Sequence, residues 1–89
     1  MVLVKTTYKG ASAETIETKV TDKIEQAVLA IDGLKYVTSN SAKNVSIVAV
    51  MFELSKPVEV AVNDVRDKVS AVVLDSEIDK PSVSQRVNI

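Results

Sequence analysis

Apolar residues recur along this chain with two different spacings, and the change of spacing divides it into strands and helices. Every second residue over positions 2–8 is apolar, β-branched or aromatic, which predicts a strand. Over residues 13–31 apolar residues recur every three or four positions, which predicts an amphipathic helix capped by Ser12 and ended by Asp32-Gly33. Its buried stripe is expected to consist of Ile16, Val20, Ile24, Ala27, Val28 and Ile31.

Two strands are predicted in the middle of the chain. Residues 34–40 alternate, with Leu34, Tyr36 and Thr38 on one face, and a polar turn at 40–44 follows. The segment 45–54 has no polar face, which is typical of a central strand covered on both sides. Its residues divide into one side with Val48, Val50 and Phe52 and another with Val45, Ile47, Ala49 and Met51.

A second helix and a fourth strand are predicted in the last third of the chain. Pro57 suits the first position of a helix, and Asp64 and Lys68 can form an ion pair one turn apart on it. A charged loop follows at 75–80, and Pro81 prevents a return to helix. The helix is expected to bury Val58, Ala61, Val62, Val65, Val69 and Val72, and the last strand to alternate Val83, Gln85, Val87 and Ile89 with Ser82, Ser84, Arg86 and Asn88.

The resulting order βαββαβ is that of the ferredoxin-like fold, in the α+β class. We expect residues 1–89 to form one domain, a four-stranded antiparallel sheet with two helices on one face. In this topology the first and third strands are the inner pair, which agrees with the apolar character of segment 45–54. Because this fold carries many unrelated functions, function has to be inferred from individual residues.

Composition excludes several kinds of functional site. The chain has no Cys, His or Trp, which rules out the usual zinc sites, a thiol nucleophile and an imidazole base. Gly10 and Gly33 are the only glycines, so no phosphate-binding loop can be written. A net charge of −1 does not favour nucleic-acid binding, and no apolar stretch is long enough to span a membrane. We expect no metal and no cofactor.

Three activities known for ferredoxin-like domains can be tested against the residues. RNA recognition needs aromatic residues on the third strand, where Phe52 is the only one. Metal transfer needs Cys-x-x-Cys in the first loop, which reads YKGASAE. Acid pairs such as Glu14/Glu17 and Asp64/Asp67 are typical of solvated helix surfaces, and no aromatic residues accompany them to form a pocket. We therefore expect no catalytic residue and no enzymatic activity.

Two predicted surfaces remain as candidates for contact with a partner. On the outward side of the second helix, Glu59, Asn63 and Asp67 recur every four residues, with Val60 beside them. A solvated face has this pattern, and so does a helix that packs against its own copies around an axis or lines a polar passage. The second surface is the side of the third strand that faces away from the helices, where burial of each large side chain is worth about 1.5–3 kcal/mol. It consists of Val45, Ile47, Ala49 and Met51.

Four segments carry a resemblance to a known family: YKGASAETIE, IDGLKYVTSNS, VMFEL and VNDVRDKVSAV. In order and spacing they are similar to the first porter subdomain, or pore subdomain, of resistance-nodulation-division (RND) efflux transporters of the acriflavine-resistance type. That family has a Tyr-Pro-Gly-Ala start, an Ile-Asp-Gly-Leu-x-Tyr segment, a Phe-Glu strand end and a helix after it. The resemblance covers nearly the whole chain.

The resemblance implies a place in the periplasmic porter region of a trimeric, proton-driven multidrug exporter of the inner membrane. The second helix would be the pore helix, with Glu59, Asn63 and Asp67 toward the threefold axis. Partners would be other porter subdomains or copies of the chain, and drug-like substrates would bind only the full transporter. The chain alone would not transport, and its first eight residues lack the pattern of a signal peptide.

The chain departs from the family pattern mainly at exposed turns. Lys9 and Lys23 stand where the family commonly has Pro, Ser55-Lys56-Pro57 replaces Gly-Thr-Asp, and Asp75-Ser76-Glu77 replaces Leu-Pro. These changes fit a fragment adapted to solubility, a split or degenerate gene, or an excised piece. The alternative hypothesis is a free-standing ferredoxin-like domain for protein interaction or small-ligand regulation, with the apolar side of the third strand as its contact surface.

Overall fold

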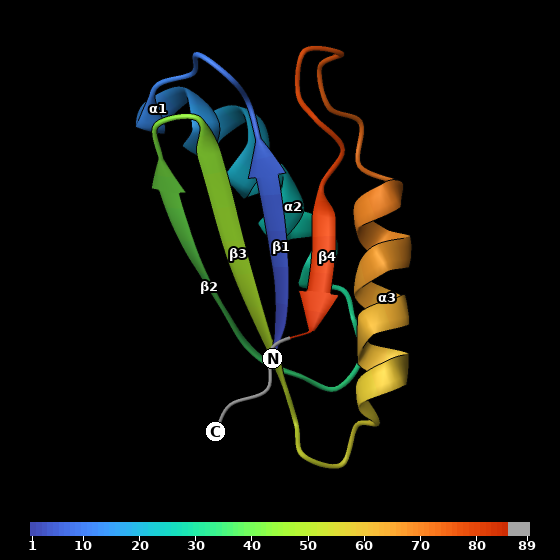
Figure 1. The fold of residues 1–89 in the computed structure, drawn as a ribbon. Helices are drawn as coiled ribbons and strands as arrows, with labels where there is room; N and C mark the ends of the chain where they lie inside the picture. Colours follow the sequence, from blue (N-terminus) through green and yellow to red (C-terminus); the bar gives the residue numbers. More distant parts are fainter. Residues whose placement is uncertain (86–89) are drawn as a thin grey trace.

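The computed structural model describes residues 1–85 and has the predicted βαββαβ order (Figure 1). The sheet order is β2-β3-β1-β4 and all pairs are antiparallel, so β1 and β3 are the inner pair as predicted. The α+β, ferredoxin-like fold is thereby confirmed. The elements are β1 (Val2–Thr7), α1 (Ala13–Ile16), the π-helical η1 (Glu17–Thr21), α2 (Asp22–Val28), β2 (Leu34–Ala42), β3 (Val45–Phe52), α3 (Val58–Ser70) and β4 (Ser82–Gln85).

The first predicted helix runs through residues 13–28 with one π-helical turn inside it. Its buried apolar residues are spaced by four, and in a regular α-helix each such step overshoots a full turn by about 40°. The wider turn, in which the Asp22 N–H donates to the Glu17 carbonyl, corrects this rotation. It also turns Val20 and Thr21 into the core together. The four fully buried apolar residues of this helical segment are Ile16, Val20, Ile24 and Val28.

The start of this helix follows the sequence signal, but its end does not: α2 stops at Val28, before the predicted end at Asp32-Gly33, and the Ile31 N–H donates to the Val28 carbonyl in a tighter turn. The Ser12 hydroxyl accepts a hydrogen bond from the Thr15 N–H at 3.2 Å, which confirms the predicted cap. Gly33 follows the helix with φ +82°, a conformation that favours glycine. Its carbonyl oxygen accepts from the Glu53 N–H at 2.8 Å and so joins this turn to the end of β3.

Valine side chains form most of the core between the sheet and the helices. Val48 and Val50 of β3 and Val4 of β1 are fully buried there, as predicted for one side of β3. Helix α3 buries Ala61, Val65 and Val69 and partly buries Val62, and Val72, which follows the helix, is also partly buried. The expected burial of Val58 is wrong, because this residue lies in the first turn of α3 beside an open groove and is 44% exposed.

Strand β2 differs from the prediction in which side chains share a face. A bulge separates Leu34 from Tyr36, and a bulge adds one residue to one strand only. Tyr36 therefore lies opposite Met51 on the side away from the helices, whereas Leu34 and Val37 pack against the core. The prediction that Leu34 and Tyr36 share a face is wrong for this reason.

The turn between β2 and β3 is shorter than predicted, because β2 continues to Ala42 and leaves only Lys43-Asn44 as the connection. Asn44 has φ +72° and binds the loop after β1 through three hydrogen bonds. Its carbonyl oxygen accepts from the Tyr8 N–H at 2.8 Å, its side-chain oxygen accepts from the Gly10 N–H at 2.7 Å, and its own N–H donates to the Ala11 carbonyl.

The described part of β4 alternates as predicted. Val83 lies opposite Val4 on the helix side, and Ser84 lies opposite Leu3 on the other side. The predicted continuation through Val87 and Ile89 falls outside the described residues. Within residues 1–85, no helix has the length and apolar character needed to cross a bilayer.

A group of hydroxyls is buried where the π-helical turn meets the sheet. The Thr21 hydroxyl lies 2.7 Å from the Ser46 hydroxyl and 2.8 Å from that of Ser41. Thr21 and Ser46 are fully buried, and Thr21 is the hydrogen-bond partner of the Ser46 hydroxyl. The neighbouring Thr6 hydroxyl is also buried and has no partner within residues 1–85.

We expect Thr21→Val to lower the free energy of unfolding by about 1–2 kcal/mol, because the Ser46 hydroxyl is left buried without this partner. Adding Ser46→Ala removes both groups and should recover part of the loss. Urea unfolding measures both variants against Thr18→Val, an exposed control expected to change stability by less than about 0.5 kcal/mol. Equal effects of Thr21→Val and Thr18→Val would contradict the role of the buried hydroxyls.

Candidate functional site

The outward face of α3 carries the polar residues predicted as a contact surface. Glu59, Val60, Asn63 and Asp67 are all exposed, and Val60 is 46% exposed. They lie on the side of α3 opposite Ala61, Val65 and Val69, which attach the helix to the core. The α3 outward face, meaning these four exposed residues, is thus presented by a helix that is held rigidly from behind.

Two open grooves flank this helix and divide the predicted polar set. Glu59 and Asn63 line a groove of about 510 Å³ toward β4, together with Arg66. Asp67 lines a different groove of about 490 Å³ toward the end of α2, together with Asp64. The division follows from helix geometry, since residues spaced by four rotate by about 40° per step around the axis.

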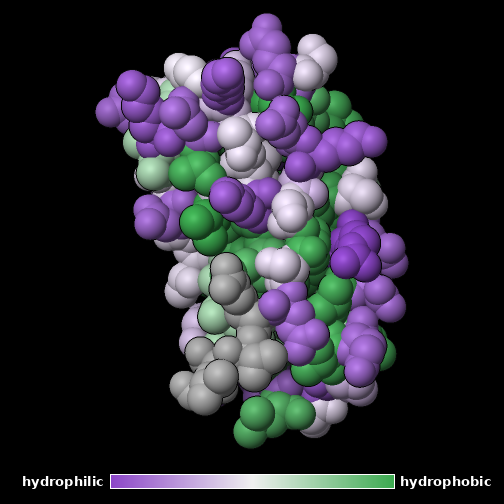
Figure 2. Space-filling view, in the orientation of Figure 1, coloured by the Kyte–Doolittle hydropathy of each residue, from purple (hydrophilic) through white to green (hydrophobic). Residues whose placement is uncertain are grey.

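The side of the sheet away from the helices is the second candidate surface. Ile47 is exposed, and Val45, Ala49 and Met51 are half-buried, so the four predicted residues lie together on this side with no element of residues 1–85 covering them. Figure 2 shows hydrophobic side chains interspersed with hydrophilic ones on the part of this face that it displays. We call it the outer sheet face.

Strand pairing adds residues to the outer sheet face that sequence reasoning missed. Leu3 lies opposite Ala49, and Tyr36 lies opposite Met51 with 48% of its surface exposed. The alternation of β1 was sufficient to assign Leu3 to this face. Tyr36 could not be assigned to it from the sequence, because the bulge in β2 changes which residues share a face. Lys5, opposite Ile47, brings a positive charge onto the face, and it has no ion pair within residues 1–85.

Lys56 joins three elements at the start of α3. Its ammonium donates to the Asp64 carboxylate of α3 at 2.7 Å and to the Asp32 carbonyl after α2. It also lies 5.1 Å from the centre of the Phe52 ring at the end of β3, a cation–π contact. Only 10% of its side chain is exposed. The predicted Asp64–Lys68 pair is wrong, because Asp64 instead binds this lysine from the preceding turn.

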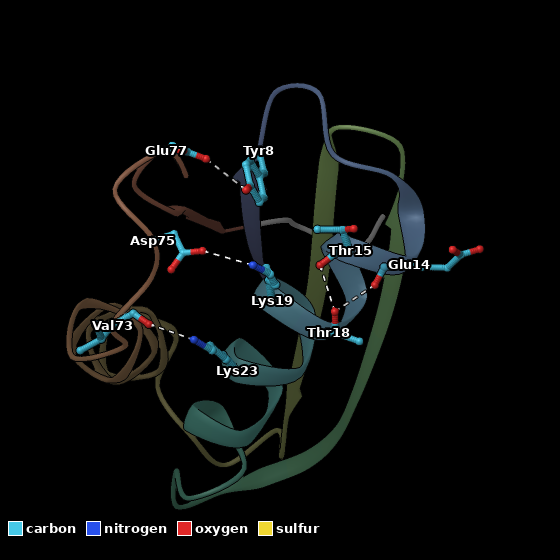
Figure 3. A network of polar contacts seen from close by, with 9 residues as sticks. All are labelled: Tyr8, Glu14, Thr15, Thr18, Lys19, Lys23, Val73, Asp75 and Glu77. Atoms are coloured by element: carbon cyan, nitrogen blue, oxygen red, sulfur yellow. Dashed lines mark hydrogen bonds and ion pairs between the residues drawn. The ribbon is translucent and has the colours of Figure 1, made fainter.

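The loop between α3 and β4 contacts both the first helix and the residue that follows β1 (Figure 3). Tyr8 donates its hydroxyl proton to Glu77 at 3.3 Å, and Lys19 pairs with Asp75 at 3.6 Å. These contacts are exposed and contribute little. The stronger attachment is Ile78, which is 8% exposed and belongs to the core. The segment 75–80, predicted as a charged loop, therefore also contributes to the core.

The acidic residues do not form a metal site in the part of the chain that is described. No group of three acidic side chains within residues 1–85 is placed to hold a metal ion. The two surfaces predicted from the sequence, the α3 outward face and the outer sheet face, are both exposed within residues 1–85.

A model of the AcrB/AcrD/AcrF family matches residues 1–88. The chain belongs to this family. This membership confirms the predicted relation to RND efflux transporters.

Individual relatives agree with the family match. An uncharacterized transporter of Haemophilus influenzae is 36% identical over 86 residues, which is 94% of this chain and 8% of that transporter. Two crystal forms of a heavy metal efflux pump superpose with TM-scores of 0.87 and 0.86. They are 22% identical and match 93% of this chain but 9% of the pump chain, and at that identity they establish the fold alone. The chain thus spans less than a tenth of the length of these relatives.

Within this family fold, Lys56 occupies the turn where the sequence departs from the expected Gly-Thr-Asp. We expect Lys56→Met to lower the free energy of unfolding by about 1–2 kcal/mol, since the aliphatic stem is kept and the charged contacts are lost. The loss is modest because the Asp64 side chain is 38% exposed, so water screens its pairing with Lys56.

Lys68→Met is the matched control, because Lys68 is exposed and has no ion pair within residues 1–85. Its expected effect is below about 0.5 kcal/mol by thermal or urea unfolding. If Lys68→Met were as destabilising as Lys56→Met, Asp64 would pair with Lys68, and the assignment of Lys56 as its partner would be contradicted.

Proposed function

We propose that this chain forms the pore subdomain of the periplasmic porter region of an RND multidrug efflux transporter. The observation that carries the proposal is the α3 outward face: a polar row on a helix anchored from behind, in a chain that belongs to this transporter family. In the trimeric transporter, Glu59, Asn63 and Asp67 face the threefold axis and Val60 packs beside them.

Within this proposal, the outer sheet face supplies the second contact. It exposes apolar side chains from β1, β2 and β3, and covering each large one with protein is worth about 1.5–3 kcal/mol. Another porter subdomain covers this face in the assembled transporter. The subdomain therefore has one surface toward the axis and one toward its neighbour.

The chain contributes structure to the passage and performs no chemistry. Drug-like substrates are bound and moved by the full transporter, whose proton-coupling membrane part supplies the driving force. The porter region lies in the periplasm, attached to the inner membrane. Membership of the family and the two exposed surfaces of the domain support this role.

The test replaces the matched segment of a family transporter that has a measurable drug-export phenotype with residues 1–89 of this chain. Export and trimer assembly are expected to persist in the chimera, because the fold and its two contact surfaces are retained. Changing Glu59, Asn63 and Asp67 together to Ala should reduce drug resistance and weaken the trimer, since three axial contacts are lost at once.

The control changes Glu14, Glu17 and Thr18 together to Ala. These residues are also exposed on a helix, but on the other helix of the domain. The control should leave export and assembly unchanged. Unaltered export and trimerisation in the axial triple variant would refute the assigned role of α3.

A further inference from the structure

Helix α3 has two different flanks, one on each side of its outward row. It lies beside β4 at one side of the sheet (Figure 1). Glu59, Asn63 and Arg66 line the groove toward β4. Asp67 lines the groove toward the end of α2, because successive residues of a helix are separated by about 100° around its axis. Arg66 and Asp67, adjacent in sequence, therefore belong to opposite flanks.

The charges of these two residues have no partner inside the domain. Arg66 and Asp67 are exposed, and neither forms an ion pair within residues 1–85. The other acid of α3 in the groove toward α2, Asp64, already binds Lys56. Lys68 lines that groove as well, but it lies about 100° from Asp67 toward the buried side of the helix. One flank thus presents an unpaired cation and the other an unpaired anion.

The proposed trimer brings these charges close together. A threefold axis beside the α3 outward face gathers three copies of Glu59 and three of Asp67, and like charges at short range repel each other. Arg66 brings one positive charge per copy to the same surface. This charge offsets the repulsion best when it lies next to an acid of the neighbouring copy.

We propose that Arg66 of each copy pairs with Asp67 of the next copy around the threefold axis, in a closed ring of three ion pairs. This inference rests on the proposed function and identifies a contact between its pore helices. In a cyclic trimer two different surfaces meet at every interface, so the β4 flank of one α3 lies against the α2 flank of the next. These two flanks carry complementary charges.

Threefold symmetry determines which residues can meet. Rotation about the axis leaves the height along it unchanged, so equivalent residues of three helices aligned with the axis lie at one level. Arg66 and Asp67 differ in level by about 1.5 Å, whereas Glu59 lies about 10 Å from Arg66 along the helix. An arginine side chain spans the smaller difference, and its guanidinium donates two hydrogen bonds to one carboxylate. Asp67 is therefore the acid that Arg66 of the neighbouring copy reaches.

A charge exchange in the chimeric transporter tests the pair. Arg66→Asp and Asp67→Arg each place like charges together at the interface and should lower the association constant of the trimer by about tenfold or more. The double variant restores opposite charges in exchanged positions and should recover most of the loss. Analytical ultracentrifugation of the purified transporter measures the trimer fraction over a range of concentrations.

Two controls distinguish the pair from a general effect of charge. Lys35→Asp makes the same change of charge on β2, the strand farthest from β4, and should change the association constant by less than about twofold. Glu59→Arg combined with Arg66→Asp exchanges charges within the β4 flank and should not recover the trimer, because these two residues lie at different levels.

A milder variant answers the question if the charge reversals prevent folding. Arg66→Gln keeps most of the side-chain stem and removes only the charge, and it should weaken the trimer by several-fold. Added salt should weaken the unmodified trimer more than the Arg66→Gln trimer, since salt screens the ion pair that only the former contains.

The outcomes separate this inference from the proposed function. The ion pair is refuted if the Arg66 variants leave the trimer unchanged, or if Arg66→Asp is rescued by Glu59→Arg and not by Asp67→Arg. In both cases the role of α3 still stands if the axial triple variant weakens the trimer. A trimer that withstands the axial triple variant and every Arg66 variant would contradict both.

Discussion

Strand β3 imposes the constraint on which the rest of the structure depends, because apolar side chains leave both of its faces. Val48 and Val50 are fully buried under the helices, in the one core cluster to which α2 and α3 also contribute. On the other side, Ile47 is exposed and Met51 is half-buried opposite Tyr36. In a strand of this kind, the domain covers the apolar side chains of one face, and the apolar side chains of the other face are available to a neighbouring protein surface.

The anchoring of α3 follows from the same arrangement. Val65 and Val69 hold the helix against the core, and Lys56 holds its first turns against the end of β3 and the turn after α2. The polar side of the helix is left free by these contacts. A family function at a threefold axis would require such a helix, rigid at the back and exposed at the front.

Much of the fold could be predicted from sequence periodicity, because the strands alternate and the helices bury one stripe. What could not be predicted came from interactions between distant segments. The π-helical turn serves the contact of Thr21 with Ser46, and the β2 bulge is visible only through its pairing with β3. Val58 has the right spacing for burial, but its place in the first turn of α3 leaves it beside an open groove.

The candidate surfaces were predictable to different extents. The exposed row of α3 follows from its four-residue spacing, whereas its division between two grooves requires the positions of α2 and β4. The partner of Asp64 could not be found by helical spacing, since Lys56 lies before the helix and reaches it through the fold. Sequence reasoning identified local faces well and ion pairs between elements poorly.

Oxidation of Met51 distinguishes an outer sheet face that is covered inside a larger transporter from one that stays exposed. Peroxide oxidation of this half-buried residue is measured in the isolated chain and in a transporter carrying it, with Leu54→Met as a fully exposed reference. If a neighbouring subdomain covers this face, Met51 will oxidise several-fold more slowly in the transporter than in the isolated chain, relative to the reference. Equal relative rates in both settings would contradict it.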